Sequence, residues 1–321
     1  MNPDATLTRT SRLAAPLRRG SPVAWLLLQS IAWGAPAPPP APARIDLDAF
    51  EATKKSVALP DGETLAYLTM GDPAGTPVVL IHGYTDSARD WVPLIPYLSP
   101  RLKLIVVDIR GHGRSGKPEC CYTRVDFAYD IKLLLDALHI ERADVVGHSL
   151  GSIVAQTFAE VWPEHTGRVV LISSSGGPRP GGPPHAAKFD YAAAIRQLQE
   201  PIDPNSKFMV EWWWSPTPVD PDFNRRQRED AAAIPLRVWL AVLDQGLIDT
   251  DLQRTLPRLK APTLLIWGSE DPIMQAEVRD TLRAALPQAE VRIFPGLGHN
   301  PFWEEPAQCA ALINRFLMVG S

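Results

Sequence analysis

The G-x-S-x-G stretch at residues 147–151 constrains the fold of this chain more than any other feature. It follows a valine-rich apolar run at 143–146, which predicts the end of a buried strand, and it opens a segment at 150–161 with helical spacing of apolar residues. Such a sharp strand-to-helix reversal strains the backbone of Ser149, and a side chain in place of either glycine would collide with it. The stretch therefore predicts a hydroxyl held at the top of a sheet, above a helix N-terminus that stabilises developing negative charge.

Strand-like and helix-like segments alternate on both sides of this stretch. We expect strands at residues 55–59, 64–69, 77–81, 102–107, 143–146, 168–172, 263–267 and 290–294. We expect helices at residues 91–98, 125–138, 150–161, 275–285 and 306–317. This alternation predicts an α/β fold, in which a mostly parallel sheet is flanked by helices on both faces.

The alternation stops at Ser173. A Gly/Pro-rich start at 176–186 then leads into residues of helical and aromatic composition, which include three consecutive tryptophans. Ligands of such sheets bind beyond the carboxyl ends of the strands, so an insertion at this place would form the roof of a pocket. We therefore expect a mainly helical cap at 176–258, inserted into a core made of residues 44–175 and 259–321.

The first 43 residues have the order of a secretory signal. Four arginines precede an apolar run at 23–33, which is too short to span a bilayer. Small-residue cleavage sites follow at 35–37 and 41–43, and the second is favoured because a proline follows the first. We expect export, no transmembrane helix, and a mature chain that begins near residue 44. The alternative is a cytoplasmic protein with a disordered Pro/Ala-rich extension or a misassigned start.

Composition narrows the partners of the chain. An apolar content of 45% and a charged content of 21% are ordinary for a globular protein, and a net charge of −4 gives no reason to expect nucleic acid. Three cysteines do not make a disulfide framework, and Cys120 and Cys121 are poor partners because neighbouring Cα atoms lie only about 3.8 Å apart. No CxxC or HExxH pattern is present, so we expect no metal and no cofactor.

A nucleophilic Ser149 needs a base and a group that orients the base. Asp271 directly follows the strand predicted at 263–267, and His299 follows the strand predicted at 290–294. The chain order serine, aspartate, histidine is the order expected on this architecture. Glu270 is the competing acid, and Asp271 is favoured because it lies closer to the turn before a proline.

Five motifs together resemble the α/β-hydrolase fold superfamily over about residues 50–318. They are His82-Gly83, Asp108-x-Arg110-Gly111-His112-Gly113-x-Ser115, Gly147-His148-Ser149-Leu150-Gly151, Gly268-x-x-Asp271 and Gly298-His299. The resemblance is to the branch of capped serine esterases, cofactor-independent haloperoxidases and carbon–carbon bond hydrolases. Haloalkane dehalogenases and epoxide hydrolases carry an aspartate at the elbow, where this chain has Ser149, so both are set aside.

The resemblance implies a role for each residue of the site. Ser149 is the nucleophile, His299 the general base and acid, and Asp271 the acid that holds the histidine tautomer. The resemblance also implies that the backbone N–H groups of Leu150 and Tyr84 form the oxyanion hole. Two such donors, aimed at a tetrahedral oxyanion, each contribute about 3 kcal/mol.

Other residues in these motifs have local roles in our interpretation. We expect Asp108 and Arg110 to form a structural ion-pair and turn network behind the site. His82 and His148 flank the site and are expected to pack or hydrogen-bond locally. Trp213 is a candidate substrate-binding residue, because its tryptophan run forms either an aromatic wall of the pocket or the core of the cap.

We therefore expect a serine hydrolase that cleaves a small, apolar carboxylic ester or lactone. Perhydrolysis, carbon–carbon cleavage of a dienoic diketone and amide cleavage use the same residues and remain alternatives. A non-catalytic binding protein on the same fold is a further alternative, and the presence of Ser149, Asp271 and His299 weighs against it. The sequence does not identify the oligomeric state.

Overall fold

A computed structural model describes residues 42–177, 191–248 and 252–319 of the chain. Of the predicted export segment at 1–43, residues 1–41 therefore lie outside the described residues.

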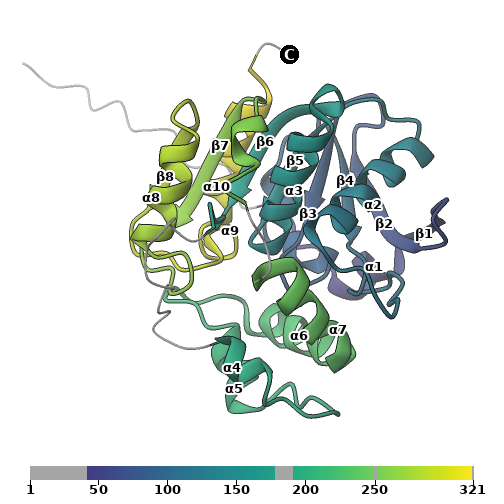
Figure 1. Cartoon of the computed structure of the whole chain (residues 1–321), viewed down its shortest axis with the longest axis vertical. Helices are drawn as coiled ribbons and strands as arrows, with labels where there is room; N and C mark the ends of the chain where they lie inside the picture. The colour runs from purple at the N-terminus through teal and green to yellow at the C-terminus, as the bar shows by residue number, and fades with distance from the viewer. Residues whose placement is uncertain (1–41, 178–190, 249–251, 320–321) are drawn as a thin grey trace, which may run out of the picture. The chain divides into compact units, whose positions relative to one another are not determined.

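The described residues form one eight-stranded sheet in the order β1-β2-β4-β3-β5-β6-β7-β8 (Figure 1). The strands are β1 (Lys55–Ala58), β2 (Thr64–Gly71), β3 (Thr76–Ile81), β4 (Leu102–Asp108), β5 (Ala143–His148), β6 (Thr166–Ile172), β7 (Thr263–Gly268) and β8 (Glu290–Phe294). Strand β2 runs antiparallel to both β1 and β4, and the other neighbours pair in parallel. The eight predicted strands and the α/β fold class are thus confirmed.

Helices cover both faces of this sheet, and in the view of Figure 1 α3 lies in front of it and α10 behind it. Four predicted helices are present, namely α2 (Arg124–Ala137), α3 (Leu150–Val161), α8 (Ala276–Ala285) and α10 (Pro306–Leu317). The sequence did not predict the short elements α1 (Leu47–Ala52), η3 (Pro163–His165) and α9 (Pro301–Glu304). Because the central strands are covered on both faces, every residue of β5 and β7 is buried.

The helix predicted for residues 91–98 is wrong. The chain there forms two short 3-10 turns, η1 (Ala88–Trp91) and η2 (Ile95–Tyr97). Pro93 and Pro96 have no backbone N–H to donate, so a continuous α-helix would lose hydrogen bonds at both positions. Five apolar residues of this segment are nevertheless buried, which explains why their spacing indicated a helix; they are Trp91, Val92, Leu94, Ile95 and Leu98.

Between β6 and β7 the chain forms a helical insertion, which we define as the described residues 191–248 (Figure 1). Its elements are α4 (Tyr191–Ile195), α5 (Lys207–Trp212), α6 (Pro221–Ala232), α7 (Leu236–Ala241) and the π-helical η4 (Val242–Ile248), and the 3-10 turn η5 (Leu256–Arg258) follows it. No single described helix is long and apolar enough to cross a membrane, although α6 and the α7–η4 helix, bent by 91°, meet the length and composition test together.

The expectation that Cys120 and Cys121 are poor disulfide partners is also wrong. The structure joins their Sγ atoms in a disulfide between adjacent residues, although the Cα atoms are 3.8 Å apart. Cys121 has a φ of 76°, so the bond lies in a tight left-handed turn between β4 and α2. Cys309 is a free, buried residue on α10.

Candidate active site

Ser149 occupies a strained turn between β5 and α3. Its φ of 49° and ψ of −117° lie outside the regions that a residue with a side chain prefers. A Cβ at Gly147 would lie 2.2 Å from the Gly151 carbonyl oxygen, and a Cβ at Gly151 would lie 2.1 Å from the Ile81 carbonyl oxygen. The predicted collisions are confirmed, and they explain why this turn needs glycine on both sides of Ser149.

His299 and Asp271 meet beyond the ends of β8 and β7. The Nδ1 atom of His299 lies 2.9 Å from Oδ2 of Asp271. The other oxygen of Asp271 accepts from the backbone N–H groups of Ile273 and Met274, which fixes the carboxylate. Glu270 is exposed and its carboxylate accepts from Ser269 Oγ. Of the two acids weighed from the sequence, the one in contact with His299 is Asp271.

The electrostatic interactions of this pair favour the doubly protonated, positively charged form of His299. Burial lowers the pKa of His299, but the charge and hydrogen bond of Asp271 outweigh it, so that pKa lies above its ordinary value of 6.5. Burial raises the pKa of Asp271, but the His299 charge and the hydrogen bonds outweigh this effect and hold it below 3.8. The arrangement can therefore accept a proton at His299 and stabilise the resulting imidazolium.

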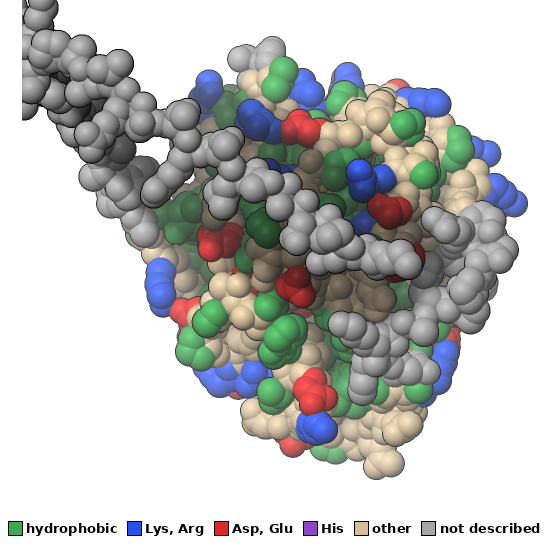
Figure 2. All heavy atoms as spheres, turned by 90° about the vertical axis from the view of Figure 1, so that its left-hand side faces the viewer, with side chains coloured by type: hydrophobic (Ala, Val, Ile, Leu, Met, Phe, Trp, Pro, Cys, Tyr) green, Lys and Arg blue, Asp and Glu red, His purple; other side chains and the backbone are tan. Residues whose placement is uncertain are grey.

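One cavity of about 320 Å³ brings the candidate residues together. Ser149, His299 and Tyr84 line it from the strand ends, and the insertion lines it with Trp212, Trp213 and Trp214 among others. Leu150 is buried at the first position of α3, and Asp271 is buried behind His299. On the face shown in Figure 2, hydrophobic and acidic side chains are exposed around a hollow near the middle of the molecule.

The tryptophan run lines the cavity and also packs within the insertion. Trp213 is buried, and its Nε1 donates to Asp86 Oδ1 at 3.3 Å. Trp212 stacks on Phe208 and donates to Thr85 Oγ1 at 3.2 Å. Trp214 is 58% exposed. The two interpretations of this run, a pocket wall and a packing core, therefore both describe part of it.

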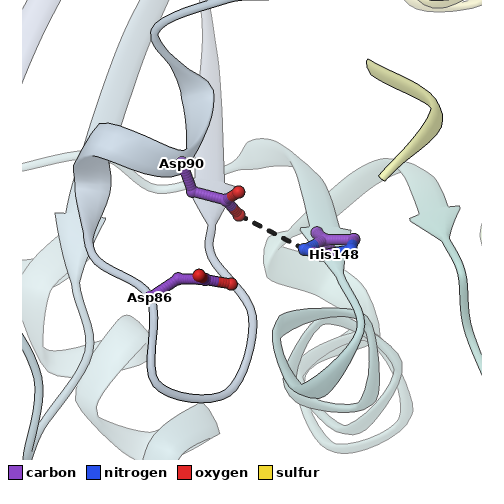
Figure 3. Close-up of side chains that lie close together, drawn as sticks. All are labelled: Asp86, Asp90 and His148. Atoms are coloured by element: carbon purple, nitrogen blue, oxygen red, sulfur yellow. Dashed lines mark ion pairs between the residues drawn. The ribbon is translucent and has the colours of Figure 1, made fainter. Parts of the chain in front are cut away.

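Asp86, Asp90 and His148 form a buried cluster (Figure 3), and Asp86 and His148 also line the cavity. Each residue has one atom that could ligate a metal ion, and these three atoms lie within 4.8 Å of one another. N–H groups already point at the carboxyl oxygens, from Trp213 to Asp86 and from Trp303 to Asp90. Since these donors present the positive ends of their dipoles to the cluster, the contacts suit hydrogen-bonded acids better than a metal cation.

Sequence reasoning did not identify Asp86 and Asp90. A signal was present, because both follow closely on the strand predicted at 77–81, whose carboxyl end lies at the same edge of the sheet as Ser149. Their proximity to His148, however, depends on how the loop after β3 folds back.

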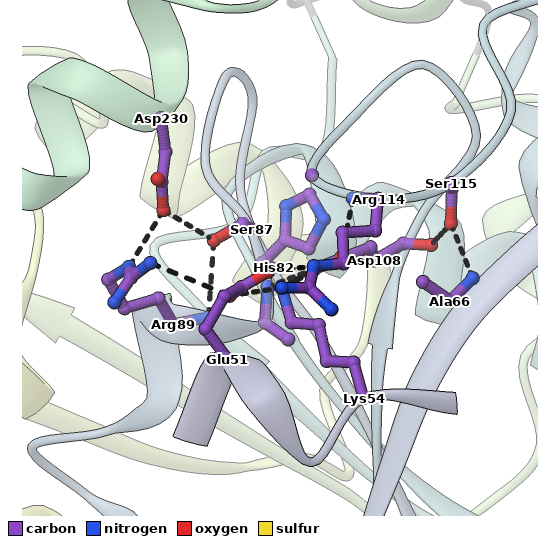
Figure 4. A network of polar contacts seen from close by, with 12 residues as sticks. Glu51, Lys54, Ala66, His82, Ser87, Arg89, Asp108, Arg114, Ser115 and Asp230 are labelled. Carbon is purple, nitrogen blue, oxygen red and sulfur yellow. Dashed lines mark hydrogen bonds and ion pairs between the residues drawn. The ribbon is translucent and has the colours of Figure 1, made fainter. Parts of the chain in front are cut away.

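The charged residues of the motif at 108–115 form ion-pair networks, and Figure 4 shows the one around Asp108. Asp108 pairs with Lys54 at 2.8 Å, and Arg110 pairs with Asp130 at 2.6 Å. The expected ion pairs thus exist, although Asp108 and Arg110 each bind a different partner. His82 donates from Nδ1 to the Gly83 carbonyl and accepts at Nε2 from Ile109 N–H, so it bonds locally as expected.

Comparisons with known proteins agree with this geometry. The profile of the alpha/beta hydrolase fold family matches residues 76–306. A 2-hydroxy-6-oxononadienedioate/2-hydroxy-6-oxononatrienedioate hydrolase of Paraburkholderia xenovorans is 29% identical over 283 residues, which are 83% of this chain and 95% of that protein. Lipase 1 of Psychrobacter immobilis is 26% identical over 261 residues, which are 78% of this chain and 79% of the lipase.

A solved structure shows the same fold. The esterase from Rhodococcus sp. ECU1013 matches with a TM-score of 0.71 and 21% identity, covering 83% of this chain and 98% of the esterase. The family profile spans most of the chain, and the eight-stranded sheet with its helical layers accounts for the match. The protein therefore belongs to the alpha/beta hydrolase fold family and is a hydrolase.

Proposed function

We propose that this hydrolase cleaves small, largely apolar carboxylic esters or lactones through an acyl-enzyme on Ser149. The observation that carries the proposal is a single cavity lined by both Ser149, at its strained elbow, and His299, hydrogen-bonded to Asp271. In the first step His299 Nε2 takes the proton of Ser149 Oγ as this oxygen attacks the ester carbonyl. The leaving alcohol takes that proton from His299, and a water activated by His299 then releases the acid.

Two backbone N–H groups would stabilise the tetrahedral oxyanion. The N–H of Leu150 is at the N-terminus of α3, where the helix dipole favours negative charge. Tyr84 follows β3, and its hydroxyl donates to the Trp239 carbonyl at 2.6 Å, which fixes the residue against the insertion. These positions support the oxyanion-hole assignment of Leu150 and Tyr84.

The lining of the cavity favours an uncharged substrate. Its walls are rich in aromatic side chains, and Glu211 adds an acidic side chain to it. Acidic groups disfavour an anionic ligand because like charges repel in a partly desolvated site. Dicarboxylates of the kind named for the Paraburkholderia relative are therefore less favoured here than neutral esters and lactones.

A substrate panel combined with active-site labelling tests the proposal. We expect hydrolysis of short p-nitrophenyl esters and simple lactones, and covalent labelling by a fluorophosphonate on the peptide that contains Ser149. Preferred cleavage of an amide or a dienoic diketone, or preferred perhydrolysis, would replace the proposed substrate class. A label on another residue would contradict the mechanism, and inactivity on the whole panel without labelling would favour a binding protein.

Trp213 should influence which acyl chain is accepted. Its side chain lines the cavity, so Trp213→Ala should lengthen the pocket and shift the ratio of kcat/KM for long and short p-nitrophenyl esters by about tenfold toward the longer ester. The control is Trp162→Ala, which removes a tryptophan that stacks on Tyr129. Equal loss of activity on every ester in Trp213→Ala, together with a lower Tm, would show that Trp213 acts through packing alone.

A further inference from the structure

The backbone carbonyl of His299 is held by two side chains from the neighbouring strand ends. Ser173 Oγ donates to it at 2.6 Å, and His148 Nε2 lies 3.2 Å from it. Ser173 follows β6, and His148 is the last residue of β5. The loop that carries His299 is thus fixed to the same part of the sheet that carries Ser149.

This contact determines the tautomer of His148. A carbonyl oxygen only accepts hydrogen bonds, so Nε2 of His148 carries the proton. Burial lowers the pKa of His148 to about 3, which keeps the ring neutral. Its Nδ1 atom is therefore a bare acceptor, and it is buried without a hydrogen-bond donor among the described residues.

Asp90 faces this bare nitrogen. Its Oδ2 lies 3.3 Å from Nδ1 of His148, and its side chain is fully buried (Figure 3). Trp303 Nε1 donates to its other oxygen, Oδ1, at 2.9 Å, and Gly83 N–H donates to Oδ2 at 3.4 Å. A protonated Oδ2 can accept from Gly83 while it donates to the histidine. Two acceptors at this separation repel each other unless one of them carries a proton.

We propose that Asp90 is a positioning residue whose protonated carboxyl donates from Oδ2 to Nδ1 of His148, so that His148 holds the His299 carbonyl in place. The contact between Asp90 and His148 is then a hydrogen bond between neutral groups. Burial raises the pKa of Asp90 to about 8, which agrees with a carboxyl that keeps its proton at neutral pH. The inference rests on the proposed function, in which His299 is the base.

Other titratable groups face the pair from several elements. Asp86 lies on the same loop, where burial raises its pKa, and its Oδ1 accepts from Trp213 and Gln227. His299 and Asp271 face the pair from the loops after β8 and β7. His82 lies at the end of β3, and burial lowers its pKa to about 4, so it stays neutral. Asp86 is therefore the one competing acid that we identify for the same proton.

Above pH 8 the Asp90 carboxyl should lose its proton, and a buried anion would then face the lone pair of His148. The resulting repulsion should loosen the hold on His299, so kcat should fall on the alkaline side with a midpoint near pH 8. KM should change little, because Asp90 lies behind the cavity and is fully buried.

The test is the pH profile of Asp90→Asn, measured on an aliphatic ester in a pH-stat. The amide can donate to His148 and accept from Trp303 at any pH, and the contact that it gives up is the long one from Gly83 N–H at 3.4 Å. We therefore expect kcat at neutral pH to stay within about fivefold of wild type. The alkaline fall near pH 8 should disappear. Asp90→Ala removes the donor and should lower kcat by about 10- to 100-fold at all pH values, since misplacing a reacting group has a cost of that order. The control is Asp280→Asn, at an exposed residue of α8.

Three outcomes would overturn the assignment. An alkaline fall in Asp90→Asn that matches wild type would do so, as would Asp90→Ala with wild-type kcat. If Asp86→Asn removes the fall and Asp90→Asn does not, the proton belongs to Asp86. Ser149→Ala is measured in parallel, because activity surviving in that variant refutes the proposed function, whereas its complete loss leaves the Asp90 result to decide the inference alone.

A measurement on the wild-type protein keeps the inference testable if the variants do not fold. Histidine labelled with ¹⁵N reports the protonation of each ring nitrogen by NMR. At pH 7 the ring of His148 should be neutral, with its proton on Nε2. A His148 ring that is protonated on both nitrogens at this pH would mean that Asp90 is an anion, and the proposal would be wrong.

Discussion

Ser149→Ala should lower kcat on p-nitrophenyl esters by about 10⁶-fold, the loss recorded in subtilisin when the nucleophilic serine is removed. Without the hydroxyl no acyl-enzyme forms, and what remains comes from binding and from the oxyanion N–H groups. The fold should persist, because the strained φ of 49° at this position is imposed by the surrounding turn and an alanine adds no atom to it. Labelling by a fluorophosphonate should disappear at the same time.

The matched control is Ser56→Ala, an exposed serine on the edge strand β1, which should keep both activity and labelling. Cooperative thermal unfolding of Ser149→Ala, with a Tm close to that of wild type, separates loss of chemistry from loss of structure. An alanine variant that retains most of its esterase activity would show that another group is the nucleophile.

The fold could be predicted from the sequence in those segments whose buried apolar residues repeat with the regular spacing of a helix or a strand. Helices α3 and α10 and strand β8 begin and end at the predicted residues, since their apolar positions repeat with the period of the element. The segment at 91–98 shows the limit of this reasoning. Most of its apolar residues are buried, as a helix would require, but Pro93 and Pro96 divide it into two 3-10 turns.

The candidate site could be predicted in part for a similar reason. Ser149, Asp271 and His299 each follow a strand, and parallel strands bring their carboxyl ends to one edge of the sheet. Asp90 could not be found this way, because its contact with His148 depends on the path of the loop after β3. The protonation states of Asp90 and His148 cannot be predicted from their positions in the sequence, because burial and the surrounding hydrogen-bond donors determine them.

Asp271→Asn should lower kcat by about 10⁴-fold, as the corresponding change does in serine proteases, with little effect on the fold. In the wild type, Nδ1–H of His299 donates to Asp271 Oδ2, which leaves Nε2 free to take the serine proton. An asparagine can present its N–H₂ group to Nδ1 and thereby stabilise the tautomer that carries the proton on Nε2. It also removes the charge that stabilises the imidazolium formed during the reaction.

Asp271→Asn should move the acidic limb of the pH profile to lower pH, because it removes a negative charge beside His299. In the wild type the pKa of His299 is raised above 6.5 because Asp271 outweighs the effect of burial, so activity should fall as the pH drops through a value above 6.5. Asp271→Asn removes that charge, so the pKa of His299 should fall and the acidic limb should move to lower pH. Glu270→Gln, at the exposed neighbouring acid, should leave both kcat and the limb unchanged. If Glu270→Gln instead lowers kcat as much as Asp271→Asn is expected to, the acid that orients His299 is Glu270, and the contact of His299 with Asp271 is not needed for catalysis.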